Sequence, residues 1–356
     1  MFRLEKDVKT RITDLIGIEH PIIQAGMNYG AYPPLVAAVS NAGGLGILGA
    51  GSMNAGELRK NIKTIREMTD NPFGVNLLAT SPLIDELLDV MIEEEIPVAS
   101  YGRGDPKKIV GRTKPHGIIN MPTVGAVKHA SRVESYGADA VIVQGMEGGG
   151  HTSYLSTLVL LPQVATSVKI PVVAAGGFCD GKGLVSALAL GAEGISMGTR
   201  FALTEESSIP ENVKQFYVDS SGVDAVITDR VTGTRCRGLL NKLVRITEGE
   251  RRGLAIKESI SSLLELRRTF NISLWKILLS GMRMKRAYQI PAGQLDSAAA
   301  GNLRIKKALV EADLEWGFMP CGQVCGRIDD IPTCQELMQR IMQETDDIIS
   351  GIYQKR

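Results

Sequence analysis

Short apolar runs alternate with helical stretches over the first two-thirds of the chain, and this alternation constrains the fold more than any other feature. The runs are rich in valine, isoleucine and alanine and are bounded by glycine or polar residues, as buried strands are. Strands are predicted at residues 20–27, 45–48, 72–78, 96–100, 117–121, 140–143, 171–175 and 194–197. Helices are predicted between most of them, at residues 35–42, 57–68, 83–95, 124–136, 158–168 and 181–190.

Repeated strand–helix units predict a parallel sheet, and about eight of them predict an α/β fold of the TIM-type (β/α)8 barrel class. In such a barrel the active residues lie at the carboxyl ends of the strands. The candidate site residues follow five of the predicted strands: Gly26, Met27, Asn76, residues 144–151, Gly176, Gly177, Gly198 and Thr199. They can converge only if the sheet closes or reverses its strand order.

The strand at residues 140–143 opens into the loop QGMEGGGH, which ends at His151. Gly148, Gly149 and Gly150 leave the backbone bare, so a planar or charged ligand can approach it closely. A titratable side chain in a loop at a strand end is typical of an active site. The alternative is a flexible connector with a surface histidine. Three consecutive glycines lose much conformational entropy on folding, which favours the site.

Length and charge exclude several classes of protein. The 356 residues suffice for one large α/β domain with an inserted or appended subdomain. A net charge of +1 provides no general basic field for binding nucleic acid. No amino-terminal apolar segment resembles a signal peptide, and no apolar run reaches membrane-spanning length. A cytoplasmic protein without a membrane partner is therefore expected.

Two further patterns are rejected as binding sites. The five cysteines are scattered, and Cys321, Cys325 and Cys334 have no histidine near them to complete a zinc site, so neither disulfides nor metal are predicted. Gly44, Gly46 and Gly49 match the dinucleotide fingerprint G-x-G-x-x-G. That fingerprint requires a strand before the glycines and a helix after them. Here a helix precedes them, so a Rossmann site is not predicted.

The composition changes after residue 202, where we predict a mainly helical lid at residues 203–310 on a barrel formed by 1–202 and 311–356. A helix at 214–219 and a strand at 224–228 are expected, and a long helix at 331–353 should pack back on the barrel. Residues 245–286 hold ten Lys or Arg against four Asp or Glu. This run is either a solvated helical face or a basic lip for an anionic substrate tail. Arg267, Arg268 and Arg283 are its candidate substrate-binding residues.

Four motifs together resemble the FMN-dependent family of nitronate monooxygenases (2-nitropropane dioxygenases) and type II enoyl-ACP reductases. They are PIIQAGM…SNAGGLGILG, FGVN, ADAVIVQGMEGGGH and PVVAAGGFCDGKGL…GAEGISMGTRF, and the segment GQVCGRIDDIPTCQELMQRI is also similar. The resemblance covers nearly the whole chain. The QGMEGGGHTS loop and the basic run are most similar to a branch acting on CoA thioesters, as in bacterial steroid-ring breakdown. Gly148 departs from the family, which often has alanine or serine there, and this difference predicts a looser loop.

The resemblance implies FMN and assigns roles to the candidate residues. Glycine turns suit a phosphate, so Gly176, Gly177, Gly198 and Thr199 should hold that group. The side-chain amides of Asn76 and Gln144 can pair with the pyrimidine edge of the flavin. Lys128 matches a lysine that the family uses near the flavin, and Met27 should pack against the isoalloxazine. The remaining cofactor-binding candidates are Gly26, Gly149, Gly150 and Met197.

His151 matches the catalytic histidine of the family, where it would act as general base or general acid. His20, His116 and His129 lack a comparable setting and are expected to be structural or exposed.

Three functions remain open. The first is an FMN oxidoreductase acting beside the carbonyl of an acyl (CoA or ACP) thioester and exchanging hydride with NAD(P)(H). The second is a nitronate monooxygenase that uses O2, and the third is a flavin-binding subunit without catalysis. His151 argues against the third, and the basic run favours the first. The acyl group, the direction of hydride transfer and the choice of NADH or NADPH stay open, and a homodimer is the expectation for assembly.

Overall fold

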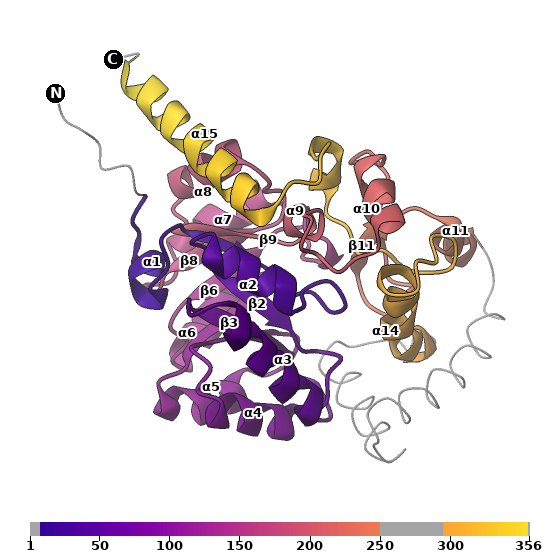
Figure 1. Ribbon diagram of the computed structural model, residues 1–356, viewed down its shortest axis with the longest axis horizontal. Helices are drawn as coiled ribbons and strands as arrows, with labels where there is room; N and C mark the ends of the chain where they lie inside the picture. Colours follow the sequence, from indigo (N-terminus) through magenta and orange to yellow (C-terminus); the bar gives the residue numbers. More distant parts are fainter. Residues whose placement is uncertain (1–7, 250–294, 355–356) are drawn as a thin grey trace.

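The computed structural model describes residues 8–249 and 295–354, and its core is one sheet of eight parallel strands (Figure 1). The strand order is β1-β9-β8-β6-β5-β4-β3-β2. These strands are β1 (Ile22–Gln24), β2 (Gly46–Gly49), β3 (Phe73–Leu78), β4 (Val98–Gly102), β5 (Ile119–Val124), β6 (Val141–Gln144), β8 (Val172–Ala175) and β9 (Gly194–Met197). The predicted TIM-type barrel is confirmed, and each of its strands lies within a predicted run or overlaps one.

The barrel closes along the seam between β1 and β2, where a parallel bridge joins Ile23 to Leu45. The Gln24 N–H donates to the Leu45 carbonyl at 2.9 Å, and the Leu45 N–H donates to the Ile22 carbonyl at 3.0 Å. The buried side chain of Gln24 continues this ladder, because its Oε1 accepts from the Ile47 N–H at 3.1 Å and its Nε2 donates to the Ile47 carbonyl at 3.2 Å. A side-chain amide offers the same donor and acceptor as a peptide, so it replaces the missing strand pairing.

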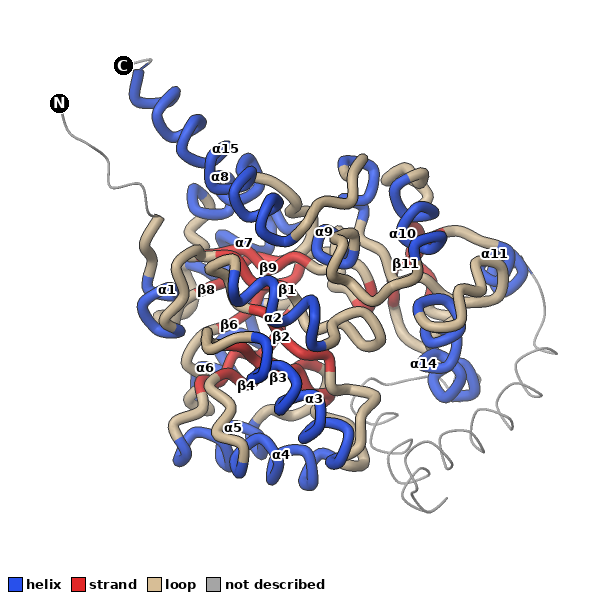
Figure 2. Tube along the Cα trace, in the orientation of Figure 1, coloured by secondary structure: helices blue, strands red, loops and turns tan. Residues whose placement is uncertain are grey.

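Helices surround the sheet (Figure 2). They are α2 (Pro33–Asn41), α3 (Ala55–Met68), α4 (Ile84–Glu93), α5 (Lys107–Thr113), η1 (Lys114–His116), α6 (Val127–Ser135), α7 (Thr157–Ala165) and α8 (Gly181–Ala189). The predicted helices are confirmed with shifts of a few residues at their ends, whereas α5 was not predicted. Local chemistry fixes the start of α3: the Asn54 side chain accepts from the Glu57 N–H at 2.9 Å, and the Asn54 N–H donates to the Glu57 carboxylate at 2.8 Å.

The interior of the barrel is filled with apolar side chains. One buried cluster includes Ile23, Leu45, Ile47, Val98, Met121, Ile142 and Val173. Helix α1 (Arg11–Ile16) adds Ile12 to this cluster, and Thr10 just before it donates to the Glu193 carbonyl ahead of β9 at 2.7 Å. Helix α1 therefore covers the amino-terminal ends of the strands, which leaves the carboxyl ends for ligands.

Three glycines allow close backbone packing around β2: Gly44 lies against β1, Gly46 lies against α2, and Gly49 lies against the loop before α2. A Cβ atom added at Gly46 would lie 2.1 Å from the Val36 carbonyl oxygen, and one added at Gly49 would lie 2.2 Å from the Met27 carbonyl oxygen. Any side chain at these positions would push the helix and its preceding loop off the strand. Close packing is therefore the physical reason for the glycines that imitate a dinucleotide fingerprint.

A second, three-stranded antiparallel sheet lies beside the barrel in the order β10-β11-β7. Its strands are β7 (Gly150–His151), β10 (Ala225–Thr228) and β11 (Cys236–Leu239). Near it are α9 (Thr199–Ala202), α10 (Glu211–Val218), α11 (Lys242–Gly249) and α14 (Leu295–Leu309) (Figure 1). The helix and strand expected at 214–219 and 224–228 correspond to α10 and β10, whereas β11 was not predicted. The lid boundaries stay a prediction, because residues 250–294 lie outside the described residues.

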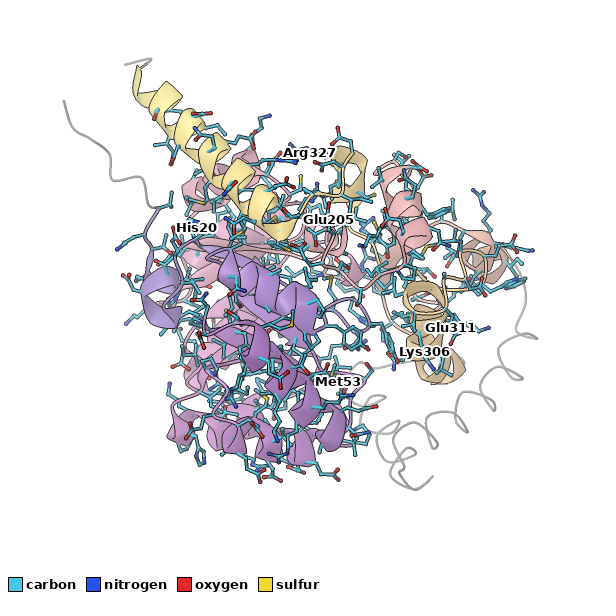
Figure 3. The ribbon with its side chains drawn as sticks, viewed as in Figure 1. His20, Met53, Glu205, Lys306, Glu311 and Arg327 are labelled. Atoms are coloured by element: carbon cyan, nitrogen blue, oxygen red, sulfur yellow. The ribbon has the colours of Figure 1, made fainter. Side chains whose placement is uncertain are left out.

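The C-terminal helix α15 (Cys334–Gln354) packs on α8, as the sequence predicted. The Gly181 N–H donates to Glu344 Oε2 at 2.8 Å, and a Cβ at Gly181 would lie 2.7 Å from the Ile341 carbonyl oxygen. The preceding 3-10 helix η3 (Gln323–Arg327) is joined to α8 by an ion pair between Arg327 and Asp180, the α8 N-cap (Figure 3). None of the helices in the described part of the chain is long and apolar enough to cross a membrane.

Candidate active site

A cavity of about 1980 Å3 opens at the carboxyl ends of the barrel strands. Every loop that leaves a strand of the barrel contributes to its wall, for example at Gly26, Gly51, Ala79, Arg103, Gly125, Gly148, Gly176 and Gly198. The loop between β10 and β11 adds Thr234 and Arg235, and the C-terminal segment adds Pro320 and Gly322. The cavity therefore lies between the barrel and the second sheet.

The predicted cofactor-binding residues all line this cavity, as does His151. They are Gly26, Met27, Asn76, Lys128, Gln144, Gly149, Gly150, Gly176, Gly177, Met197, Gly198 and Thr199. Their roles stay predictions, but their convergence follows from closure of the sheet. Arg267, Arg268 and Arg283 lie outside the described residues.

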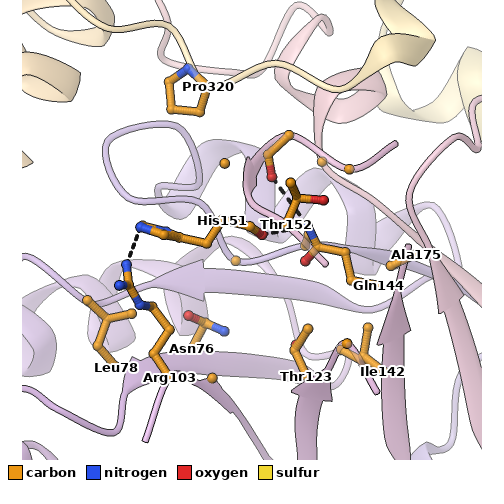
Figure 4. A pocket seen from close by; sticks show the side chains of 18 of the residues that line it. Asn76, Leu78, Arg103, Thr123, Ile142, Gln144, His151, Thr152, Ala175 and Pro320 are labelled. Carbon is orange, nitrogen blue, oxygen red and sulfur yellow. Dashed lines mark hydrogen bonds between the residues drawn. The ribbon is translucent and has the colours of Figure 1, made fainter. Parts of the chain in front are cut away.

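Asn76 and Gln144 present amides to the cavity from β3 and β6. The Asn76 Nδ2 donates to Ser100 Oγ at 3.2 Å, and a Cβ at Gly26 would lie 2.3 Å from the Asn76 Cβ. The Gln144 Nε2 donates to the His151 carbonyl at 2.9 Å (Figure 4). One function of Gln144 is therefore to fold the glycine loop back on its own strand.

Gly148 leaves space for the Gln144 side chain to make this hydrogen bond. A Cβ at Gly148 would lie 2.5 Å from Gln144 Nε2, so alanine or serine there would displace the amide that binds the loop. Gly149 has a different contact, since a Cβ there would lie 2.6 Å from the Gly322 nitrogen. The two glycines therefore bring the loop against its strand and against the C-terminal segment.

Glu147 has a structural function within the glycine loop. Its carboxylate accepts from the Thr157 N–H at 2.9 Å and from Thr157 Oγ1 at 2.9 Å, at the first turn of α7. Its backbone carbonyl accepts from the Gln323 N–H at 3.0 Å. A negative charge at a helix N-terminus is stabilising, so Glu147 anchors the loop to α7.

His151 is held by the second sheet. It pairs with Cys236 in the β7–β11 ladder, and Gly150 pairs with Arg237 beside it. The buried guanidinium of Arg237 donates to the Met146 carbonyl through Nε at 3.1 Å and through Nη2 at 2.9 Å. The histidine backbone is thus fixed from both the barrel and the second sheet.

Arg103 approaches the His151 ring from the end of β4. Its Nη1 contacts His151 Nε2 (Figure 4). Its Nη2 donates to Thr234 Oγ1 at 3.0 Å. Arginine only donates, so Nε2 is the acceptor and the ring proton lies on Nδ1. Burial, and then the charge of Arg103, lower the pKa of His151 well below its usual value. The imidazole is therefore neutral at pH 7.

The mouth of the cavity is both cationic and aromatic. Tyr154 is 78% exposed, and the Arg235 guanidinium lies 4.7 Å from its ring centroid. Lys128 and Arg132 are exposed on α6 and also line the cavity. Such cations suit an anionic ligand. Of Tyr154, Arg235, Lys128 and Arg132, only Lys128 was predicted from the sequence as a site residue.

The other histidines have the settings expected of them. His20 precedes β1, at the end of the barrel away from the cavity, and its Nε2 lies 3.7 Å from Glu19 (Figure 3). His116 and His129 are exposed, although His129 also reaches the cavity wall from α6. Within residues 8–249 and 295–354, no three His, Cys, Asp or Glu side chains are grouped as metal ligands.

Comparison with known families identifies the chain. The family model described as "Nitronate monooxygenase" matches residues 9–344, which is more than half of the sequence. The chain belongs to the nitronate monooxygenase family. The resemblance seen in the sequence is thereby confirmed, and so is the prediction of an oxidoreductase.

Three relatives show the range of this nitronate monooxygenase family. A "(3aS,4S,5R,7aS)-5-hydroxy-7a-methyl-1-oxo-octahydro-1H-indene-4-carboxyl-CoA dehydrogenase" from Rhodococcus jostii is 41% identical over 94% of this chain and 95% of its own. A "Probable nitronate monooxygenase" from Staphylococcus saprophyticus is 36% identical over 67% of this chain and 80% of its own. The solved structure of FabK from Thermotoga maritima covers 98% of this chain and 99% of its own, with a TM-score of 0.79 and 37% identity.

Proposed function

We propose that this protein is an FMN-dependent oxidoreductase acting next to the carbonyl of an acyl thioester, with hydride exchanged with NAD(P)(H) through the flavin. The observation that carries the proposal is the His151 imidazole on the cavity wall, neutral and in contact with a guanidinium. A neutral imidazole can take the proton beside a carbonyl, and a nearby cation can stabilise the oxygen that becomes negative.

The cavity fits FMN together with a second ligand. Its volume of about 1980 Å3 exceeds the ~300–1,000 Å3 of an ordinary ligand pocket. Gly176 and Gly177 have φ angles of 94° and 91°, which side chains rarely adopt. They keep the end of β8 bare at the cavity wall, as a phosphate-binding turn requires.

In this proposal different residues of the barrel bind different parts of FMN. Gly176, Gly177, Gly198 and Thr199 hold the phosphate, while Asn76 and Gln144 face the pyrimidine edge. Lys128 supplies a positive charge near the ring, and Met27 supplies an apolar contact. Gly26, Gly149, Gly150 and Met197 complete the wall. Bound FMN would supply the hydride acceptor and donor, and His151 would supply or take the proton.

The purified protein should be yellow and contain non-covalent FMN. The glycine turns after β8 and β9 motivate this expectation, because they line the cavity and a glycine backbone lets a phosphate approach closely. Heat denaturation should release a flavin that is identified as FMN by chromatography and fluorescence. If no flavin is released even after reconstitution with FMN, the cofactor assignment is wrong.

A CoA thioester is the preferred substrate class. Support comes from the cations Lys128, Arg132 and Arg235 at the cavity mouth, and from the Rhodococcus jostii relative, whose name describes a carboxyl-CoA dehydrogenase. Arg267, Arg268 and Arg283 are proposed to add phosphate contacts from the basic run.

Replacing Arg267, Arg268 and Arg283 together with alanine should raise the apparent KM for a CoA substrate. Each lost charge-assisted contact is worth on the order of 1 kcal/mol when partly exposed. The difference from wild type should shrink at high salt, because screening weakens such contacts. Steady-state kinetics at low and high salt measure this effect. An unchanged KM at low salt would identify the run as a solvated face.

The pH profile of the reaction should report the lowered pKa of His151. A neutral histidine is required for proton removal, and a lowered pKa keeps it neutral below the usual value of 6.5. The acid limb of kcat/KM for substrate oxidation is therefore expected below pH 6.5. An acid limb of kcat/KM at or above pH 6.5 would contradict the contact of the His151 ring with the Arg103 guanidinium.

Oxidation of alkyl nitronates with O2 is the second candidate, favoured by the match of the family model. The same base and cation suit a nitro group as well as a carbonyl. Anaerobic stopped-flow reduction of the flavin by NADH and NADPH separates the two functions. Fast reduction supports the thioester proposal, whereas oxygen consumption with a nitronate and no nicotinamide supports the alternative.

A further inference from the structure

Arg103 adopts an unusual backbone conformation at the end of β4. Its φ is 61°, in the left-handed region, and Gly104 follows with a φ of 131°. Residues other than glycine rarely adopt this region, and those that do cluster at functional sites because surrounding contacts hold them there. Among the contacts of Arg103 are those of its guanidinium with His151 in β7 and with Thr234 in the loop between β10 and β11.

The contact with Arg103 makes the proposed base unavailable. A substrate proton would be accepted by the lone pair on His151 Nε2. That lone pair already accepts a hydrogen bond from Arg103 Nη1. The His151 backbone cannot move away from Arg103, because Gln144 donates to the His151 carbonyl and His151 pairs with Cys236. The base is therefore freed only when Arg103 donates to something else.

The cavity offers a place for that other acceptor. Arg103 and His151 both line it, so a ligand oxygen can reach the guanidinium while its neighbouring carbon faces the imidazole. We propose that Arg103 is the residue that binds the activating oxygen of the substrate and, in doing so, releases His151 Nε2 to act as the base. This inference rests on the proposed function and names the oxygen-binding group of that site.

The step balances without an oxidant. The C–H bond next to the carbonyl breaks, and its proton forms an N–H bond at His151 Nε2. The electron pair of that bond forms the carbon–carbon double bond of the enolate, and the π pair of the carbonyl moves to its oxygen, which then faces the Arg103 guanidinium. The new imidazolium would repel the guanidinium if nothing lay between them, and the enolate charge offsets this repulsion. With a nitro compound, the same exchange gives a nitronate.

A purely structural role is the competing explanation for Arg103. The residue joins the end of β4 to the second sheet through Thr234, so it also ties the lid side to the barrel. A tie of this kind would affect folding and flavin content, but it would not decide the rate at which a bound substrate loses a proton. The two explanations are therefore separated by proton exchange in a folded, flavin-loaded variant.

The test measures exchange of substrate α-protons for deuterium in D2O, with the holoenzyme, at one fixed pH and without oxygen or nicotinamide. Butyryl-CoA and nitroethane are the probes, and mass spectrometry follows deuterium uptake. Net oxidation cannot exceed one equivalent of enzyme under these conditions, whereas exchange is catalytic. Wild type should exchange one or both probes, and Arg103→Gln should slow that exchange by about 10²-fold. Arg103→Lys should recover part of it, because an ammonium can still bind the oxygen.

Arg230→Gln is the matched control, since Arg230 is an exposed arginine between β10 and β11 and is not one of the residues that line the cavity. It should exchange nitroethane as fast as wild type. Flavin content and Tm show whether each variant is folded. In the free wild-type enzyme, ¹⁵N NMR of labelled histidine should show His151 Nε2 without a proton, with the signal assigned by its loss in His151→Ala.

Each outcome is decisive. Exchange by Arg103→Gln at the wild-type rate, or a protonated Nε2 in the free enzyme, overturns the inference and leaves the proposed function intact. No exchange of either probe by wild type overturns the proposed function, and the inference with it. Slow exchange in a folded, flavin-loaded Arg103→Gln variant supports both.

Discussion

His151→Ala should keep FMN bound and slow the reaction with the organic substrate by about 10²–10⁴-fold, the range expected for loss of one positioned acid or base. The glycine loop is held by backbone pairing with β11 and by the Gln144 side chain bound to the His151 carbonyl, so alanine should leave it in place. Hydride exchange with nicotinamide needs no proton from this residue. Anaerobic stopped-flow should therefore find a normal half-reaction with nicotinamide and a slow one with substrate.

His129→Ala is the matched control for this experiment. His129 also lines the cavity, but it is exposed on α6 and is not predicted to take part in proton transfer. It should retain both half-reactions, which would show that loss of a histidine from the cavity wall is not sufficient to impair the enzyme. If His151→Ala reacts with substrate at the wild-type rate, the glycine loop serves cofactor binding alone.

The barrel could be predicted because its signals are local. Each strand is a short β-branched run that ends at glycine or a polar residue, and the barrel rule then places those ends together. Asn76 and Gln144 were selected in this way from two separate strands, and the structure places both on one cavity wall. Closure itself was not readable from the sequence, since it depends on one bridge and on the side-chain amide of Gln24.

The second sheet could not be predicted, because a strand of two residues has no periodicity. Strand β7 consists of Gly150 and His151, and it exists only because β11 provides its partner far along the sequence. Arg103 was missed for a similar reason. It stands in the turn YGRGD with no motif around it, and its left-handed φ is imposed by tertiary contacts. Its one available signal was its position just after the strand predicted at residues 96–100.

Gly148 shows how a departure from the family pattern acquires a physical meaning. The sequence alone suggested a looser loop at this position. The structure instead places Gln144 Nε2 where the Cβ of an alanine would be, 2.5 Å from it, and this amide binds the His151 carbonyl. The missing side chain therefore permits an additional tie between β6 and the histidine, which tightens the loop.

Arg237→Met should destabilise the protein by about 2–4 kcal/mol and release the glycine loop that carries His151. Arg237 is only 3% exposed, and its guanidinium donates to the carbonyls of Met146 and Ala225. Methionine fills a similar volume but provides no donor, so both carbonyls would lose their hydrogen bonds in a buried setting. A free energy of unfolding from urea titration and a Tm from calorimetry measure the loss, and flavin content should fall as well.

Arg230→Met separates this effect from the general loss of an arginine. Arg230 lies seven residues earlier, its side chain is 52% exposed, and it donates to the carbonyls of Thr247 and Glu248 at the surface. Water can replace its hydrogen bonds, so the variant should stay within about 0.5 kcal/mol of wild type. The comparison tests whether the placement of the glycine loop depends on the hydrogen bonds of the Arg237 side chain. Equal stability of the two variants would mean that the backbone pairing with β11, together with Gln144 and Glu147, holds the loop, and that the Arg237 side chain adds nothing to the placement of His151.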